Sequence, residues 1–374
     1  MHELPVETFT GAGVVIRPPR EEDLPDLVAA VDDPVIRRFT MPLAPDPFTG
    51  AHARAWLEQA VPAGTAAGEA HLIVAEPDGD RLIGAVAVTG RRDGGHTATL
   101  DWWTASWARG RGVSVSATSA VAAWALRHGI GRLEMLADPA NAKGQRVAAA
   151  AGFTHEGVRR AAGPAADGTW RDLVVWSRLS GDSGDPAARS LPDLPPGGLT
   201  DGVVTVDAVR ASDADAMYTL MALPDVIATT VAPAPPTPEA VARRCAEAGY
   251  RWLIGARADC AIRDAATGEF AGDIGLMPEP PTRSAMVGYS VVPRFRGRGY
   301  AGRAVRLLTA WAFDVAGFER LSAGAAPDNS ASRRTLEHAG FREEGYEHSR
   351  LPAPPGATAR VDNILYALLR NTTH

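Results

Sequence analysis

The sequence predicts an α/β protein built from two tandem domains, each a mostly antiparallel mixed sheet flanked by helices. Its 374 residues exceed what one ordinary α/β domain needs. Short apolar runs alternate with segments of helical spacing in both halves. Landmarks of the first half recur in the same order 187 to 190 residues later, which indicates a duplicated domain. The recurring residues are Arg20 and Arg210, Arg109 and Arg296, Asn141 and Asn329, and Asp172 and Asp362.

A segment dense in Pro, Gly, Ser and Asp separates the two halves and has no apolar periodicity. It predicts a linker over residues 180–200. The expected domains are therefore an N-terminal one over residues 1–179 and a C-terminal one over residues 201–374.

The elements are clearest in the second half, where apolar residues 203–209 predict a first strand. Ser212 is expected to cap the first helix, because acidic residues follow it in the first turn. Thr237 followed by Pro238 predicts the start of a second helix, since Thr caps well and Pro suits the first helical position. Three further strands are expected at residues 260–263, 270–277 and 285–292.

A glycine-rich turn comes next and separates the last of these strands from a helix. Residues 301–313 are apolar at helical spacing and predict that helix. Residues 320–324 form a short apolar run that predicts a buried strand. A helix is expected at residues 330–339, ended by Gly340, and a closing strand at residues 361–369.

Composition narrows the class of protein. The chain is 45% hydrophobic with a formal net charge of −6, which suits a core-forming protein and argues against nucleic acid as the main partner. The sequence has no apolar run near the ~18 residues of a membrane span. Two cysteines, Cys245 and Cys260, are too few for a disulfide framework or a zinc site. We expect a cytoplasmic protein with no metal and no membrane partner.

The sharpest local signal is the glycine-rich turn itself. Glycines let successive backbone N–H groups point inward, and the following helix adds its unpaired N–H groups and the positive end of its dipole. The pattern predicts an anion site suited to a diphosphate; the alternative is a structural turn with solvated arginines. Its residues are Val291, Val292, Arg296, Gly297, Arg298, Gly299, Tyr300, Ala301 and Gly302, and the first half keeps Arg109, Gly110, Arg111 and Gly112.

A family resemblance rests on these residues. Arg296-x-x-Gly299-x-Ala301, between a strand and a helix, resembles the acyl-CoA-binding motif of the GNAT N-acetyltransferases. Asn329-x-x-Ser332, followed by a Gly-Phe pair, is similar to the branch of ribosomal-protein alanine N-acetyltransferases. The resemblance covers nearly the whole chain, once per half. It implies two tandem GNAT folds, each with a splayed sheet.

The resemblance also implies roles for the site residues. The turn would hold the diphosphate of coenzyme A, and the strand with Val291 and Val292 would pair with the pantetheine arm. The arm would enter through a splay between that strand and residues 320–324. Asn329 would hydrogen-bond the arm or the substrate, and Ser332 would protonate the departing thiolate. The alternative for both residues is helix capping alone.

The general base is the open question in the second half. Leu351 stands where a glutamate assists in this branch. A water chain, Tyr289 or Tyr346 could substitute, and Tyr346 is carried forward as the catalytic candidate. Glu344 recurs in the first half and is therefore expected to be structural.

The first half departs further from the family pattern. Ser114 replaces the expected Gly or Ala, and Gly144 stands where the second half has Ser332. Asp101 is either a base or an incidental neighbour of the core tryptophans Trp102 and Trp103. We therefore expect the second domain to be catalytic and the first to be structural, imitating the partner of a dimer.

The function expected from the resemblance is direct transfer of an acyl group, most simply from acetyl-CoA, to an amine of a small molecule or a peptide N-terminus. The proline-rich connections at residues 41–50 and 222–237 should form the acceptor end. The chain would act as a monomer with two similar halves or as a homodimer. The alternatives are a non-catalytic acyl-CoA-binding or regulatory protein and an enzyme that uses a larger acyl group.

Overall fold

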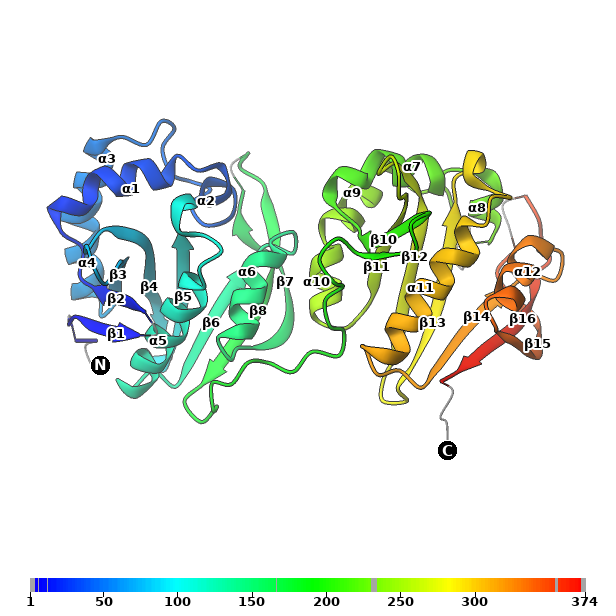
Figure 1. Ribbon diagram of the computed structural model, residues 1–374. Coiled ribbons are helices and arrows are strands. Elements are labelled where there is room, and N and C mark those ends of the chain that lie inside the picture. Colours follow the sequence, from blue (N-terminus) through cyan, green and yellow to red (C-terminus); the bar gives the residue numbers. More distant parts are fainter. Residues whose placement is uncertain are drawn as a thin grey trace. The chain divides into compact units, whose positions relative to one another are not determined.

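The computed structural model describes residues 4–5, 7–11, 13–165, 167–229, 234–353 and 356–370. The chain divides into two compact units, Met1–Ala188 and Arg189–His374 (Figure 1). Within the described residues, each unit holds one eight-stranded mixed sheet with helices packed against it. The predicted architecture of two tandem α/β folds is therefore confirmed.

The first unit has the strand order β1-β2-β3-β4-β5-β6-β8-β7, in which the β5–β6 pair is parallel and the other pairs are antiparallel. Its elements are β1 (Phe9–Gly11), β2 (Val14–Arg17), η1 (Glu21–Asp23), α1 (Leu24–Val31), α2 (Pro34–Phe39), α3 (Gly50–Ala55), η2 (Trp56–Ala60), α4 (Val61–Ala66), β3 (Ala70–Ala75), β4 (Leu82–Arg92), η3 (Asp93–Gly95), β5 (Thr97–Thr104), η4 (Ser106–Ala108), α5 (Val113–Arg127), β6 (Arg132–Ala137), α6 (Ala142–Ala150), β7 (Thr154–Pro164) and β8 (Trp170–Leu179).

The second unit repeats this plan in the order β15-β16-β14-β13-β12-β11-β10-β9, with β13–β14 as the parallel pair. Its elements are β9 (Leu199–Thr200), β10 (Val204–Ala208), η5 (Ala211–Asp213), α7 (Ala214–Met221), α8 (Pro224–Thr229), α9 (Pro238–Ala246), α10 (Ala248–Leu253), β11 (Ala258–Asp264), β12 (Phe270–Glu279), β13 (Ser284–Val291), η6 (Pro293–Phe295), α11 (Tyr300–Asp314), β14 (Arg320–Ala325), α12 (Ser330–His338), β15 (Arg342–Leu351) and β16 (Val361–Leu369).

The parallel strands separate partway along their length in both units. Three residue pairs join β13 to β14, the last being Met286 with Ser322, although β13 continues to Val291. The pairing of β5 with β6 likewise ends at Thr99 with Glu134. The expected splay of the sheet is therefore present twice, at the end of the strand that leads into the glycine-rich turn.

Alternating side chains give the second sheet two packed faces. Ala261 of β11 packs in a cluster with Met217, Leu220 and Val241 from α7 and α9. Its neighbours along the strand, Cys260 and Ile262, instead pack with residues of α11 and α12. Because successive strand residues face opposite sides, α7 and α9 cover one face while α11 and α12 cover the other.

Two helix starts show where local sequence was sufficient. Thr237 caps α9 as predicted, its hydroxyl oxygen accepting from the Ala240 N–H at 3.2 Å. The expected cap at Ser212 is wrong, because Ser212 lies inside η5 and α7 begins two residues later. There the buried Asp213 accepts from the Arg210 N–H at 2.8 Å and organises the turn.

Strand β15 was not expected from the sequence. Its residues are mostly exposed on both faces, so no apolar alternation marks it. Among the described strands it pairs with β16 alone, at the edge of the sheet, and its register shifts twice. The short helices α8 and α10 were also not predicted.

The middle of the predicted linker is packed rather than free. The Ala187 N–H donates to the Ala149 carbonyl at 2.9 Å in the first unit. Leu191 is fully buried in the core of the second unit, and the Trp252 indole donates to the Pro192 carbonyl at 3.0 Å. The division between the two units falls inside the predicted linker.

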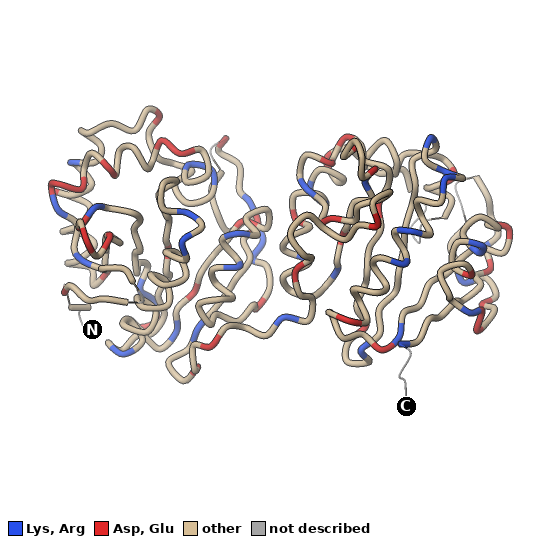
Figure 2. The backbone as a smooth tube through the Cα atoms, in the orientation of Figure 1, with Lys and Arg blue, Asp and Glu red and all other residues tan. Residues whose placement is uncertain are grey.

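Basic and acidic positions are interspersed along both units (Figure 2). In the part of the chain that the structure describes, no helix has the length and apolar character needed to cross a membrane.

Candidate functional site

The glycine-rich turn of the second unit opens toward free space. Gly297 and Gly299 have φ angles of 70° and 79°, in the left-handed region that favours glycine. A Cβ added at either position would meet no described atom within 4 Å. Gly299 is also the N-cap of α11, so the unpaired N–H groups of the first helical turn lie beside the turn. These features fit a diphosphate, because a ligand can approach the backbone where a side chain would stand.

The arginines of the turn have unequal roles. Arg296 braces the turn, since its Nε donates to the Val291 carbonyl at 2.8 Å and one terminal nitrogen donates to Asp225 at 2.6 Å. Asp225 is therefore the ion-pair partner of Arg296. The Arg298 guanidinium lies 5.7 Å from the centre of the Phe295 ring and remains at the rim of the turn.

Two of the predicted cofactor-binding residues already form hydrogen bonds within the protein. The Tyr300 side chain is 4% exposed, and its hydroxyl donates to Asp264, so only the backbone of Tyr300 can serve a ligand. The Val292 N–H donates to the Ala271 carbonyl at 2.9 Å across the sheet. Since successive N–H groups alternate in direction, the Val291 N–H points to the splay, where an extended arm could pair with it.

The first unit keeps the same turn geometry. Gly110 and Gly112 both have φ angles of 76°, and Gly112 is the N-cap of α5. Arg109 again donates to the strand carbonyl before the turn, here that of Thr104 at 3.3 Å, and it pairs with Asp33. Ser114 accommodates its hydroxyl by a 2.7 Å hydrogen bond with Thr104. The departure from Gly or Ala therefore leaves the backbone of the turn unchanged.

Asn329 and its counterpart Asn141 are both helix caps. The Asn329 side chain accepts from the Ser332 N–H at 3.0 Å, and the Asn141 side chain accepts from the Gly144 N–H at 3.0 Å. The capping alternative is therefore sufficient to explain why Asn recurs at this position.

Ser332 lies beside Tyr289. Their hydroxyl oxygens are 3.0 Å apart, and the Tyr289 hydroxyl also donates to the Ser332 carbonyl at 3.2 Å. Tyr289 belongs to the part of β13 that has already separated from β14. Burial raises the pKa of Tyr289, which keeps its hydroxyl protonated and able to donate. In the first unit the equivalent residues, Trp102 and Gly144, have no hydroxyl.

Tyr346 lies elsewhere, on the edge strand β15. It is 48% exposed and its hydroxyl donates to Asp362 at 2.7 Å, which raises the pKa of the tyrosine. Asp362 also accepts from the N–H of Ser349, whose φ is 52°, and thereby supports an irregular stretch of the strand. Asp172 does the same for Ala161 in the first unit. The recurring aspartate thus has a structural role.

The recurring glutamates are structural as well. Glu344 pairs with Arg320, and its counterpart Glu156 pairs with Arg132 and accepts from Ser177 at 2.6 Å. Each joins an edge strand to its neighbours, as expected.

A partly buried carboxylate in the second unit was missed by the sequence analysis. Asp273 lies on β12 opposite Ser290 of β13, on the face covered by α7 and α9. One of its carboxylate oxygens is buried without a hydrogen-bond partner among the described residues. Burial raises the pKa of Asp273, and Arg244 offsets this only in part. A single acidic residue inside an otherwise apolar strand was the available signal.

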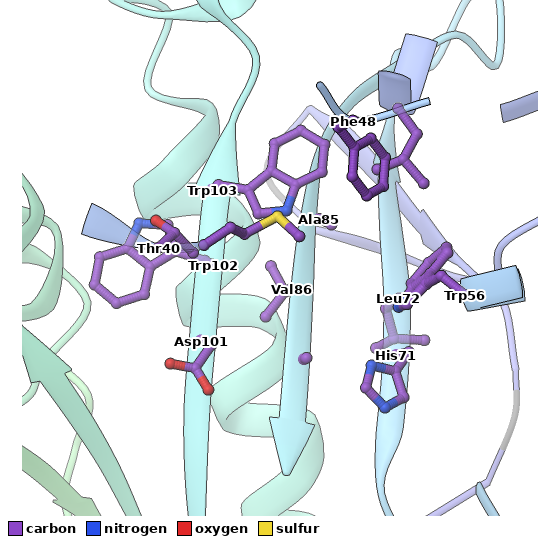
Figure 3. Close-up of a pocket in the computed structure, with 13 residues that line it drawn as sticks. Thr40, Phe48, Trp56, His71, Leu72, Ala85, Val86, Asp101, Trp102 and Trp103 are labelled. Atoms are coloured by element: carbon purple, nitrogen blue, oxygen red, sulfur yellow. The ribbon is translucent and has the colours of Figure 1, made fainter. Parts of the chain in front are cut away.

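The first unit contains a cavity of about 300 Å³ on the face of its sheet that α1 covers (Figure 3). Within it, Trp103 and Phe48 lie toward one end and Asp101 and His71 toward the other. The aromatic and titratable residues among its walls are Phe48, Trp56, His71, Asp101, Trp102 and Trp103. Trp103 packs against the core cluster under α1, as expected of a core-facing residue, and it also lines this cavity together with Trp102.

Strand register explains how Asp101 reaches this cavity. Asp101 of β5 pairs with Ala87 of β4, which pairs with His71 of β3, so the three side chains form a row on one face. Ala87 is small and leaves space between the other two. Asp101 is solvent-exposed at the cavity, yet desolvation by the neighbouring protein atoms raises its pKa to about 6, offset only slightly by a 3.5 Å contact with Thr89.

The equivalent row in the second unit has different residues. It consists of Gly288, Gly275 and Asp259. Burial alone would raise the pKa of Asp259, but nearby arginines lower it below its usual value. These arginines, Arg244 at 2.9 Å and Arg251 at 3.1 Å, lie over the face that is hollow in the first unit.

Comparison with known proteins agrees with this repeated geometry. The family model described as the acetyltransferase (GNAT) domain matches residues 14–154 and again residues 204–342. A probable N-acetyltransferase of Bacillus subtilis (strain 168), YjcK, is 40% identical over 63 residues, which are 17% of this chain and 35% of that protein. An uncharacterized N-acetyltransferase of the same organism, YoaA, is 32% identical over 98 residues, or 26% of this chain and 51% of that protein.

The chain thus spans about a third and about half of the length of these two relatives. Among solved structures, Mycobacterium smegmatis RimJ in complex with CoA-disulfide is 25% identical, with a TM-score of 0.40, and the match covers 46% of this chain and 84% of that one. An acetyltransferase of the GNAT family from Bacillus anthracis is 19% identical, with a TM-score of 0.41 and coverage of 46% and 97%. With the family model matched in each unit, the chain belongs to the GNAT acetyltransferase family and carries its domain twice.

Proposed function

We propose that this chain is an acyl-CoA-dependent N-acyltransferase that moves an acetyl group from acetyl-CoA directly to a primary amine. The observation that carries the proposal is the glycine-rich turn beside a splayed pair of parallel strands, present in both units. Membership of the GNAT family and the names of the two curated relatives support it.

The backbone of the turn serves the coenzyme. The N–H groups around Gly297 and Gly299 and the start of α11 hold the diphosphate, and Arg298 adds charge at the rim. The Val291 N–H receives the pantetheine arm in the splay. Arg296 does not contact the coenzyme but holds the turn to the end of β13 through its hydrogen bond to the Val291 carbonyl.

In the second unit, nearby side chains supply the proton transfers of the reaction. Ser332 supplies a proton to the departing thiolate, with Tyr289 as its hydrogen-bond partner. Asp273 replaces Tyr346 as the candidate base, because Asp273 lies on the face that holds a cavity in the first unit. Asn329 is a positioning residue, since it caps the helix that presents Ser332.

The acceptor is a small molecule or a peptide N-terminus that carries a primary amine. We place the enzyme in the cytoplasm, as a monomer or a homodimer that needs no nucleic acid, membrane or metal. Its net charge of −6 supports the part of this that concerns nucleic acid.

The test is release of free thiol by the full chain from acetyl-CoA in the presence of a panel of amines. Turnover that depends on the amine supports the enzyme. Saturable binding of acetyl-CoA with thiol release at the background rate supports instead a binding or regulatory protein. Competition among acetyl-, succinyl- and malonyl-CoA identifies the acyl group. Asp273→Asn should lower turnover of the second unit without changing its affinity for acetyl-CoA.

A further inference from the structure

We propose that the first unit is an active site in its own right, in which Asp101 is the general base and the acceptor is a primary amine on an aromatic or branched apolar body. This rests on the proposed function. It replaces the expectation from sequence that the first unit is structural.

The machinery for the acyl donor is intact in this unit. Gly110 and Gly112 hold the same left-handed conformations as Gly297 and Gly299, and space in front of them is free of described atoms within 4 Å of an added Cβ. The separation of β5 from β6 begins after Thr99. Asp101 lies in the separated part of β5, two residues beyond the last pair.

The cavity defines the chemistry of the acceptor. Its volume of about 300 Å³ is at the small end of ligand pockets, and Trp56, Trp103 and Phe48 give it aromatic walls. Among its thirteen described lining residues, Asp101 is the one carboxylate, and neither Lys nor Arg occurs. A polyamine would place further cations against apolar walls, and a free amino acid would place its carboxylate against Asp101 without a cation to pair with.

The position of Asp101 suits proton removal. It shares the cavity with one other titratable side chain, His71, which lies beyond Ala87 and about 10 Å away by strand spacing. His71 is itself 3.5 Å from Glu69. A carboxylate with a pKa of about 6 is ionised at neutral pH and is a stronger base than an ordinary Asp.

The step balances without another reactant. The bound ammonium gives one proton to Asp101, and the neutral amine nitrogen attacks the thioester carbon. The carbon–nitrogen bond forms, the carbon–sulfur bond breaks, and its electron pair leaves with the sulfur. The nitrogen loses a second proton as the amide forms, and the thiolate takes one proton to become free thiol. One proton is released overall, and no residue equivalent to Ser332 is needed, because a thiol with an ordinary pKa near 8.5 is a competent leaving group.

The experiment measures thiol release by the full chain from saturating acetyl-CoA. The acceptor probes are 2-phenylethylamine, phenylalanine and spermidine. We expect kcat/KM for 2-phenylethylamine to exceed the values for the other two at least tenfold. In a chain whose second turn is blocked by Gly299→Asp, Asp101→Asn should lower kcat at least 100-fold. Asp78→Asn, which changes an exposed turn residue, serves as the matched control. Ala87→Leu should fill the cavity and raise KM for the amine at least tenfold, with acetyl-CoA binding retained as the check on folding.

The outcomes separate the two proposals. If spermidine or phenylalanine supports turnover and 2-phenylethylamine does not, the enzyme assignment holds and this inference is wrong. It is also wrong if Asp101→Asn turns over 2-phenylethylamine at the wild-type rate. If no amine in the panel supports thiol release, the proposed function fails, and this inference fails with it.

Discussion

The hydroxyl groups of Tyr289 and Ser332 meet at 3.0 Å across the point where β13 has left β14. The first residue comes from the strand that leads into the glycine-rich turn, and the second from the helix after β14. In the first unit the equivalent positions hold Trp102 and Gly144, while a carboxylate absent from β13 is present on β5 as Asp101. The two units thus share the glycine-rich turn but differ in the polar side chains on the strand that leads into it and on the helix after the parallel pair.

Removing either hydroxyl of the Tyr289–Ser332 pair should lower the free energy of unfolding by a similar amount. We expect Tyr289→Phe and Ser332→Ala each to lower the free energy of unfolding by about 1 kcal/mol, and the double variant to cost less than the sum. The same variants should lower turnover by the second unit with KM for acetyl-CoA unchanged. Denaturant unfolding and steady-state kinetics measure both, with Ser330→Ala on the same helix as control. Additive unfolding costs would contradict the pairing.

The two asparagine caps should behave alike in stability. Asn329→Ala and Asn141→Ala are each expected to lower the free energy of unfolding by about 1 kcal/mol, because each leaves a helix N–H without its side-chain acceptor. Asn329→Ser retains a capping oxygen and should restore most of that stability. Loss of turnover in Asn329→Ser despite wild-type stability would show that Asn329 contacts the substrate directly.

Both turns should bind acetyl-CoA. Calorimetric titration of the full chain is expected to saturate at about two equivalents, since the turn geometry is the same in both units. Gly112→Asp and Gly299→Asp should each remove one equivalent, because each adds a side chain in a left-handed conformation and a negative charge next to the diphosphate. Saturation of the wild-type chain at one equivalent would mean that one turn is inactive.

Asp101 should make both activity and stability depend on pH. Turnover in the first unit is expected to fall as the pH drops through about 6, because the base becomes protonated. The folded state binds this proton more tightly than the unfolded state, whose Asp titrates near 3.8, so this side chain lowers stability as the pH rises from 4 to 6. Asp101→Asn should therefore raise the melting temperature at pH 7.5 and leave it unchanged at pH 3. An equal shift of the melting temperature at both pH values would show that folding does not raise the pKa of Asp101.

Local sequence was sufficient for elements with a strong pattern. The closing strand was predicted at residues 361–369, where β16 lies, and the helix after the glycine-rich turn was predicted to within one residue of α11 at each end. Strand β15 was missed because its polar residues have no buried face to produce an alternation. Ser212 was a plausible cap, but the ion pair of Asp213 with Arg263 decides where that turn begins.

The site was predictable only in part for a related reason. The glycines of the turn predict positive φ angles from the sequence, since few other residues adopt such angles. Tyr346 and Tyr289 look alike in sequence, and their different hydrogen-bond partners depend on how distant strands and helices pack. Asp273 was overlooked because it lies on the strand next to the one that leads into the turn.

The sequence by itself determined that one fold occurs twice and that each copy carries a glycine-rich turn before a helix, because both depend on residue order and short spacing. Only the tertiary structure shows that the first unit has a cavity on the sheet face that α1 covers. Phe48, Trp56, His71 and Asp101 come from separate segments, and strand register and helix packing bring them to one space. In the second unit the same face is occupied by arginines and aspartates, because Arg244 and Arg251 reach the sheet from α9 and α10.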